Sequence, residues 1–192
     1  MKLAPDESFG EQVAKFKACL QKFNAVHSLT NYDDLDAVVR DSLSGAEFIP
    51  RYPHVACDIG SGAGFPGIFL ALAMPLCEWH LFEPNQKKAA FLTYAKVSLA
   101  LANVKIHAER VQDGAKLRAD LISSRALMSA RSLVEICRGF YDENTTFLLY
   151  KGSGAEAEAA EFRKEFTSAS CEIFSGENAL KNRKFLVIKG VK

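Results

Sequence analysis

The stretch that decides the fold is Val55–Gly67, which reads VACDIGSGAGFPG. An apolar run ends in a carboxylate, Asp58, and three glycines follow at alternate positions, Gly60, Gly62 and Gly64. Glycine permits positive φ angles and lets a ligand approach the main chain closely. The proline near the end of the stretch suits a helix start, where its missing N–H would be unpaired anyway. This order of strand, tight turn and helix start predicts a pocket for a nucleoside-bearing cofactor, because free N–H groups of the helix point at it.

Beyond this turn, short apolar segments alternate with helical ones as far as the C-terminus. The expected strands are Val55–Ile59, Glu78–Phe82, Val104–His107, Asp120–Ser123, Thr145–Tyr150, Cys171–Phe174 and Phe185–Lys189. Parallel strands need a crossover, which is usually a helix, so this alternation predicts an α/β fold with a mostly parallel sheet. The polar link between the last two strands is too short for a confident helix. A closing antiparallel hairpin is expected there.

Ahead of the sheet, residues 1–52 are expected to form a helical appendage, and residues 53–192 one compact domain. Between residues 6 and 24, apolar side chains such as Phe9, Val13 and Phe16 recur every three or four positions, as on one face of a helix. Thr30 and Asp33 resemble a capping box, which predicts a second helix that starts there and ends near residue 45.

Composition limits the class of protein. The chain has 192 residues, of which 48% are hydrophobic and 24% charged, which suits one soluble globular unit. No apolar run approaches the roughly 20 residues of a membrane helix, and no signal-like segment opens the chain, so a cytoplasmic protein without membrane contact is expected. The five cysteines are scattered and the histidines lack ligand spacing, so no metal site is predicted. The net charge of +1 leaves nucleic acid open as a partner.

Two cofactor fingerprints overlap in the glycines. Residues 62–67 satisfy GxGxxG, and Glu83 lies about 20 residues further on, where a dinucleotide-binding acid is expected. Asp58, two residues before Gly60, and Glu83 at the end of the next strand instead resemble the first two motifs of S-adenosylmethionine-dependent methyltransferases. A pyrophosphate repels a carboxylate in its loop, whereas a cationic sulfonium tolerates one. S-adenosylmethionine is therefore the predicted cofactor, and an NAD(P)-dependent oxidoreductase is the alternative.

Seven further motifs carry a closer resemblance. They are Phe23–Thr30, Asp41–Leu43, Asp58–Gly67, Lys87-Lys88 with Phe91-Leu92, Leu101–Val104, Ser124–Ala126 and Lys151-Gly152. In this order they resemble the RsmG (GidB) family, bacterial methyltransferases of 16S ribosomal RNA that modify the N7 of a guanine in the 530 loop. The resemblance implies a Rossmann-like class I methyltransferase fold, with a mostly parallel seven-stranded sheet and a C-terminal antiparallel strand. It also implies 16S ribosomal RNA or the small ribosomal subunit as partner, and a monomer is expected.

The motifs and the resemblance together imply a set of cofactor contacts. These are Asp58, Gly60, Gly62, Gly64, Phe65, Glu83, Val111, Gln112 and Arg125, with Glu83 holding the ribose. The chain departs from the family at Ser28, where Asn is usual, at Gln112, where Glu is usual, and in a shorter segment between Thr30 and Asp41. His27 is expected near the substrate mouth.

The predicted catalytic residues are Arg125 and Lys151. Guanine N7 carries a lone pair and no proton, so its methylation needs neither a general base nor a covalent cysteine, and positioning suffices. Arg125 can read the guanine O6 edge or a phosphate, and Lys151 can bind phosphate, with plain ion pairs as the simpler alternatives. Lys87 and Lys88, at a helix start, fit a solvated face better than an RNA contact. Methylation of another RNA or a small molecule, and RNA binding without turnover, remain open.

Overall fold

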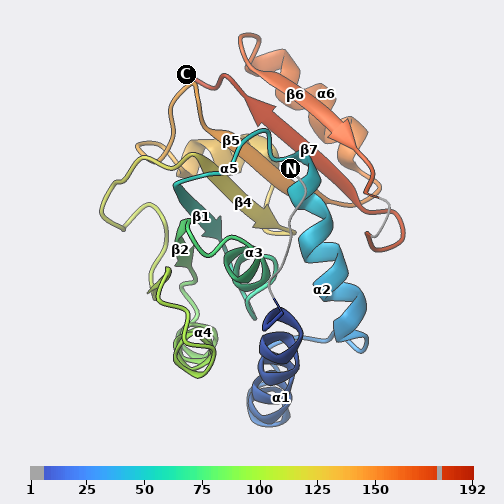
Figure 1. Ribbon diagram of the computed structural model, residues 1–192. Helices are drawn as coiled ribbons and strands as arrows, with labels where there is room; N and C mark the ends of the chain where they lie inside the picture. Colours follow the sequence, from blue (N-terminus) through green and yellow to red (C-terminus); the bar gives the residue numbers. More distant parts are fainter. Residues whose placement is uncertain (1–6, 177–178) are drawn as a thin grey trace.

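The computed structural model describes residues 7–176 and 179–192 (Figure 1). Helices and strands alternate along most of the chain. In order they are α1 (Phe9–His27), α2 (Leu35–Ser44), a short 3-10 turn (Gly45–Phe48), β1 (Val55–Ile59), α3 (Gly67–Ala73), β2 (Glu78–Phe82), α4 (Gln86–Ser98), β3 (Val104–His107), β4 (Leu121–Arg125), α5 (Ala130–Ile136), β5 (Thr146–Lys151), α6 (Ala155–Glu165), β6 (Ser170–Phe174) and β7 (Lys184–Lys189).

The strands form one seven-stranded sheet in the order β3-β2-β1-β4-β5-β7-β6. The first five are mutually parallel, while β7 is antiparallel to both β5 and β6. The predicted α/β fold with a C-terminal antiparallel hairpin is therefore confirmed. The strand order reverses between β1 and β4, and such a switch point opens a crevice at the carboxyl ends of the strands.

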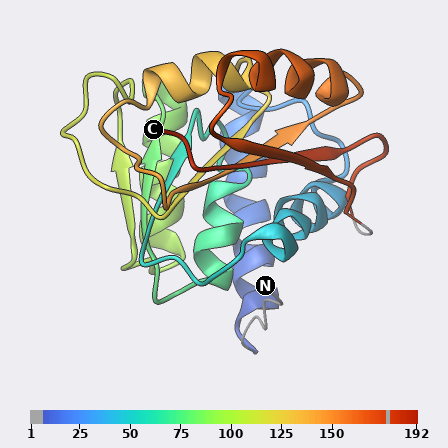
Figure 2. The ribbon, with the colours of Figure 1, turned by 90° about the horizontal axis from the view of Figure 1, so that it is seen from above.

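Helices cover both faces of the sheet. The helices α1 to α4 lie on one side, and α5 and α6 lie on the other (Figures 1 and 2). Side chains of the strands alternate between two cores: Trp79 and Leu148 pack on the first side, and Phe147 and Ile122 on the second. A sheet buried on both faces explains why the central strands read as continuous apolar runs.

The N-terminal helices pack directly on the first side of the sheet. The predicted helix at residues 6–24 appears as α1, although Asp6 lies outside the described residues. Phe16 of α1 is fully buried and meets the rings of Phe65, Phe69 and Phe91 edge-on, with centroids 4.9–5.6 Å apart. Whether residues 1–52 form a separate appendage stays a prediction, but α1 shares its core with the sheet.

The predicted start of the second helix was wrong. The N-cap of α2 is Asp34, whose carboxylate accepts the Ala37 N–H at 2.9 Å. Thr30 is instead held by the side chain of Asn24, which binds both its N–H and its carbonyl at 2.9 Å. These bonds keep Thr30 in the connection between α1 and α2. Asp34 caps the helix in its place.

Candidate active site

The glycine turn after β1 is held against the end of β2. The N–H groups of Gly60 and Ser61 donate to the Phe82 carbonyl at 2.9 and 3.1 Å. All three glycines of the turn have positive φ angles, which residues with a side chain rarely adopt. A Cβ atom at Gly60 would lie 2.9 Å from the Leu127 side chain. The turn can therefore approach Leu127 this closely only with glycine at that position.

Asp58 lies beneath the turn, with 1% of its surface exposed. The Ser123 hydroxyl donates to its Oδ1 at 2.7 Å, while Oδ2 has no hydrogen-bond partner among the described residues. A Cβ atom at Gly67 would lie 2.5 Å from Oδ2, so α3 begins in close contact with this carboxyl. Burial raises the pKa of Asp58 to about 6, because it desolvates the charged form. Asp58 is thus packed between Ser123 of β4 and the start of α3, next to the glycine turn.

A first cavity of about 200 Å³ opens beside the turn. Its lining is mostly apolar and includes Gly60, Phe82 and Leu127. The predicted cofactor residues Val111 and Gln112, which follow β3, also line it. A narrow apolar cavity with a few polar groups suits a flat heteroaromatic ring.

A second cavity of about 360 Å³ adjoins the first across Gly60 and Leu127, which line both. Among its lining residues are Tyr32, Phe65 and Arg125. Its wall therefore combines the glycine turn, the connection between α1 and α2, and the end of β4. Residues from distant parts of the chain meet at this point.

Glu83 lines the second cavity and is 6% exposed, and the next residue, Pro84, lines both cavities. Its Oε2 accepts the Gly62 N–H and its Oε1 accepts the Asn85 N–H, both at 2.8 Å. A carboxylate oxygen has room for more than one donor, so both oxygens can still accept from hydroxyl groups. The position suits the sugar of a nucleoside whose base enters the first cavity.

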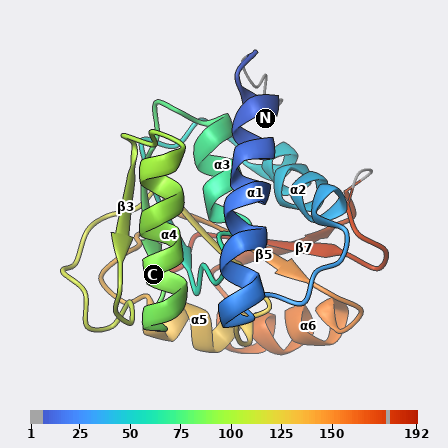
Figure 3. The same ribbon diagram turned by 90° about the horizontal axis from the view of Figure 1, so that it is seen from below.

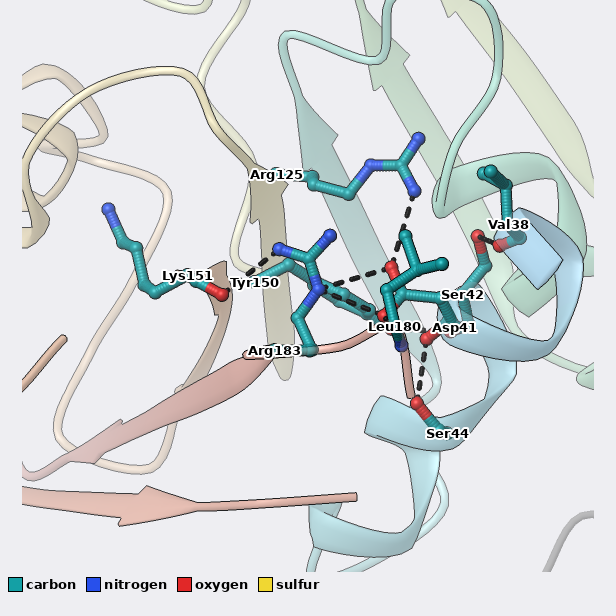
Figure 4. A network of polar contacts seen from close by, with 9 residues as sticks. All are labelled: Val38, Asp41, Ser42, Ser44, Arg125, Tyr150, Lys151, Leu180 and Arg183. Carbon is teal, nitrogen blue, oxygen red and sulfur yellow. Dashed lines mark hydrogen bonds and ion pairs between the residues drawn. The ribbon is translucent and has the colours of Figure 1, made fainter. Parts of the chain in front are cut away.

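The guanidinium of Arg125 reaches the second cavity, although only 5% of its side chain is exposed. Its Cζ lies 5.0 Å from the ring centre of Tyr32 and 5.1 Å from that of Phe65. Nη1 lies 3.5 Å from Oδ2 of Asp41, and Figure 4 shows the other terminal nitrogen pointing away from Asp41. Burial lowers the pKa of Arg125, and the aromatic rings and Asp41 favour its charged form.

Asp41 joins α2 to this site (Figure 4). It is fully buried and accepts from Nε of Arg183 at 2.9 Å and from the Leu180 N–H at 3.1 Å, in addition to its ion pair with Arg125. The Tyr150 hydroxyl donates to the carbonyl of the next residue, Ser42. One carboxylate therefore holds two arginines, from the end of β4 and from the approach to β7.

Lys151 stands at the end of β5, beside Arg125 in the sheet. Its Nζ donates to the Met128 carbonyl at 2.6 Å and pairs with Glu158 at 2.7 Å, and its side chain is 11% exposed. It lines neither cavity, whereas Met128 lines the first. The ammonium is thus bound within the protein, behind the wall of that cavity.

The structure brings most of the predicted cofactor residues together. Gly60, Val111 and Gln112 line the first cavity, and Gly60, Gly62, Phe65, Glu83 and Arg125 line the second. Gly64 lines neither, because a Cβ atom there would meet Ile68 of α3 at 2.9 Å. His27 is exposed at the end of α1, and Leu29 and Thr30 line the second cavity in its place.

Three residues of the site were missed from the sequence: Tyr32 and Asp41 had no assigned role, and Lys88 was expected on a solvated face. Tyr32 and Lys88 line the second cavity, and Asp41 anchors Arg125. A signal for Asp41 was present, since an acid among the buried side chains of an amphipathic helix needs a partner. No signal in the sequence distinguished Tyr32 from an ordinary surface residue.

Comparison with known proteins decides the family. The family model described as rRNA small subunit methyltransferase G matches residues 10–187. A ribosomal RNA small subunit methyltransferase G from Campylobacter hominis is 52% identical over 184 residues, which cover 96% of this chain and 94% of the relative. Another, from Campylobacter fetus subsp. fetus, is 46% identical over 189 residues, 97% of each chain.

The chain belongs to the family of rRNA small subunit methyltransferase G. This membership confirms the predicted resemblance to RsmG and decides for an rRNA methyltransferase that uses S-adenosylmethionine over a dinucleotide-dependent oxidoreductase.

Solved structures agree on the fold. A mutant form of MtNAS in complex with S-adenosylmethionine aligns with a TM-score of 0.65 at 16% identity, over 96% of this chain and 74% of that chain. A ribosomal protein L11 methylase from Lactobacillus delbrueckii subsp. bulgaricus aligns with a TM-score of 0.63 at 11% identity, over 84% and 81%.

The cavities fit the methyl donor of this family. Gly60 and the Leu127 side chain that packs against it line both cavities, so the turn forms part of the wall that a ligand would contact. The first cavity suits the adenine, and the Glu83 carboxylate stands where it can accept from the ribose hydroxyls. Within the described residues, no cluster of three His, Cys, Asp or Glu side chains can hold a metal ion. No described helix combines the length and apolar character needed to cross a membrane.

Proposed function

We propose that this chain methylates the N7 of a guanine in the 530 loop of 16S ribosomal RNA. The observation that carries the proposal is Arg125, which lines the cavity beside the glycine turn and whose guanidinium is anchored by Asp41. A buried arginine in this position offers donors to a nucleotide that enters next to the methyl donor. The chain belongs to a family of small-subunit rRNA methyltransferases. The choice of guanine N7 and of the 530 loop is what the resemblance of its sequence motifs to RsmG implies.

The residues that would hold the cofactor divide between the two cavities. Val111 and Gln112 would contact the base, Glu83 the ribose, and the turn from Gly60 to Gly62 the remainder. When bound, S-adenosylmethionine supplies a methyl group activated by a cationic sulfonium. Asp58, buried beneath the turn, would add negative charge near that cation.

The composition of the second cavity favours an acceptor that has no proton to lose. Of the residues that line it, Glu83 alone carries a carboxyl group, and two backbone N–H groups already bind that carboxylate. The proposal assigns that carboxylate to the ribose hydroxyls, which leaves no other carboxyl and no histidine among the described lining residues to act as a general base. Guanine N7 needs none, whereas exocyclic amines and hydroxyl groups lose a proton when they are methylated. Catalysis then depends on holding the base in place.

The surroundings of Arg125 restrict how it can bind a nucleotide. Tyr32 and Phe65 pack against the guanidinium, and Asp41 takes one end of it. The donors that remain can reach either the guanine O6 or a phosphate oxygen. Lys88, which lines the same cavity, adds a second positive charge. Both contacts would orient the base and leave N7 free.

Lys151 is proposed to act through the cavity wall. Its ammonium binds the Met128 carbonyl and the Glu158 carboxylate, so it holds the segment after β4 against α6. That segment includes Leu127 and Met128, which line the first cavity. Lys151 would then position cofactor-binding residues, while Arg125 contacts the substrate. We also propose that the chain works as a monomer and in the cytoplasm, where bacterial ribosomal RNA is assembled.

Transfer of a labelled methyl group tests the activity. Wild-type protein is incubated with labelled S-adenosylmethionine and either small-subunit or large-subunit rRNA that lacks modifications, as naked RNA and as subunits. The proposal expects label in small-subunit RNA alone. Label in both RNAs would contradict the substrate, and binding of small-subunit RNA without label would favour a module that does not turn over.

A further inference from the structure

The two longest acid-free segments of the chain both carry lysines. Residues 12–32 and 84–108 contain no Asp or Glu, although the whole chain is balanced, with 24 basic and 23 acidic residues. The first segment includes most of α1 and the second all of α4. These two helices lie side by side on the same face of the sheet (Figure 3). Two acid-free segments, far apart in sequence, therefore form one surface.

The two helices are joined by aromatic packing, which leaves a row of side chains exposed. Phe23 packs against Tyr94, with ring centres 5.0 Å apart, and against Phe91 at 5.4 Å. We define the α1/α4 face by the exposed residues along this seam, which are Lys15, Lys22, Val26, Lys87 and Tyr94. Lys15 and Lys22 are two helical turns apart, as are Lys87 and Tyr94, so each pair projects from one side of its helix.

The lysines of this face are free of acidic partners. In the two acid-free segments, Lys17 pairs with Asp36 and Lys105 with Glu78. The other five lysines have no ion pair within the described part of the chain; they are Lys15, Lys22, Lys87, Lys88 and Lys96. Unpaired lysines on adjoining helices repel one another, and an anionic partner removes that cost.

The α1/α4 face is continuous with the second cavity. Leu29 and Thr30, which line that cavity, follow directly after α1. Lys88, in the first turn of α4, lines it as well, and Lys87 precedes it. A chain that leaves the cavity on this side therefore meets Lys87 first and can continue along the seam toward Lys22 and Lys15.

We propose that the α1/α4 face binds the phosphate backbone of the RNA next to the methylated nucleotide. This rests on the proposed function for its RNA and adds the surface on which that RNA lies. Lys15, Lys22 and Lys87 contact phosphates, while the Tyr94 ring, 45% exposed, and Val26, 76% exposed, meet unpaired bases or sugars. Phosphate contacts of this kind fix the register of the RNA and leave the reading of the base to the cavity.

A charge-neutralising variant tests the proposal. The triple variant Lys15→Gln, Lys22→Gln, Lys87→Gln is compared with wild type and with a control, Lys164→Gln, Lys181→Gln, Lys192→Gln, whose three residues are exposed elsewhere. Affinity for a small-subunit RNA fragment that includes the 530 loop is measured over a range of salt concentrations. Binding of S-adenosylhomocysteine by each variant verifies that it is folded. Because each lost phosphate contact lowers the salt slope by about 0.7, the slope should fall by about 2, with about 100-fold weaker binding near 0.1 M salt.

The control variant should keep the wild-type slope and affinity. Equal slopes for all three proteins, or equal losses in both variants, would overturn the proposal, because the lysines of the face would then have no special part in binding. Unchanged affinity for naked RNA combined with weaker binding of the assembled subunit would also overturn it, in favour of a protein partner. Methyl transfer by wild type is scored separately: RNA that binds through this face without receiving label would contradict the proposed function and leave the face in place.

Discussion

The helices α4 and α6 lie on opposite sides of the sheet and use their charges differently. On α6, Lys164 pairs with Glu161 at 2.5 Å, and Glu165 pairs with Arg131 of α5 at 3.1 Å. The helix α4 and its flanks contain no acid, and none of its three lysines has an ion pair in the described structure. Lys164 of α6 is thus neutralised by an acid on its own helix, whereas the lysines of α4 remain available.

In the proposed function, this difference separates a helix whose unpaired lysines would meet the RNA from a helix whose charges are already paired. Paired surface charges contribute little attraction for a distant polyanion, whereas unpaired ones create a field that draws it in. Between these sides, at the carboxyl ends of the parallel strands, lie the two cavities.

The glycine turn should tolerate no side chain, in contrast to the glycine that precedes α6. Gly60→Val places a Cβ 2.9 Å from the Leu127 side chain at a φ of +71°, so the turn or Leu127, which both line the two cavities, must shift. We expect S-adenosylhomocysteine affinity to fall by more than about 100-fold in calorimetry, since displaced backbone contacts are lost together. Gly154→Val, where nothing lies within 4 Å, should bind normally. Equal affinity in both variants would remove the turn from the site.

Arg125 and Lys151 end neighbouring strands, but only Arg125 faces the second cavity. Arg125→Ala should lower the kcat of methyl transfer by about 10² to 10³, the usual cost of removing one well-placed donor. Lys151→Met should cost about 10-fold, because it disturbs cofactor-binding residues through Met128. Single-turnover transfer of labelled methyl groups measures both. A larger loss for Lys151→Met would reverse the assignment of the two residues.

The raised pKa of Asp58 predicts that the free energy of unfolding decreases as pH rises. Its pKa is raised by burial from 3.8 to about 6, so the folded state binds a proton more tightly than the unfolded state between these values. The stability linked to Asp58 is fully present below pH 3.8 and decreases as pH rises toward about 6. Above that pH it is lost, and the total decrease in unfolding free energy is about 3 kcal/mol. Urea unfolding of wild type and Asp58→Asn from pH 4 to pH 7.5 measures it.

The matched control for this titration has the opposite sign. The N–H of Asn144 lowers the pKa of Asp142 at the surface, so the stability linked to Asp142 is present at neutral pH and lost in acid. The difference in unfolding free energy between wild type and Asp58→Asn should shift in favour of the variant as pH rises from 4 to 7.5. The difference for Asp142→Asn should stay nearly constant over that range and shift in favour of the variant only when the titration is extended below pH 4. A pH-independent difference for Asp58→Asn would show that its carboxyl is not perturbed.

The smallest effect belongs to the charge pairs of α6. The Lys164 and Glu161 side chains are 71% and 72% exposed, so solvent screens their attraction. Lys164→Gln should change the free energy of unfolding by about 0.5 kcal/mol or less. Chemical denaturation in low and high salt measures this value. A larger loss of unfolding free energy that did not depend on salt would show that this pair stabilises the fold, contrary to the prediction.

Much of the fold was predictable because the strands are buried on both faces and bounded by turns. Each of the seven expected strands overlaps an observed one, and the closing hairpin followed from a link too short for a helix. The start of α2 was missed because it depends on Asn24, whose side chain binds Thr30 across the connection between two helices. Contacts of that kind come from packing and leave no local pattern.

The site divides in the same way. The glycine turn, Asp58 and Glu83 form a local pattern with known spacing, so the sequence predicts them. The ion pair of Arg125 with Asp41 joins β4 to α2, and the α1/α4 face joins lysines from two distant segments. The absence of acids in each segment can be read from the sequence, but their adjacency depends on how α1 packs against α4.

The central claim is that the second cavity presents guanine N7 to the methyl donor. Its most direct test is mass mapping of small-subunit RNA after reaction of the wild-type protein with unmodified small-subunit particles. The account predicts one added methyl group, found as 7-methylguanosine in the 530 loop. A methyl group on an exocyclic amine, on a ribose hydroxyl or in another part of the RNA would contradict it.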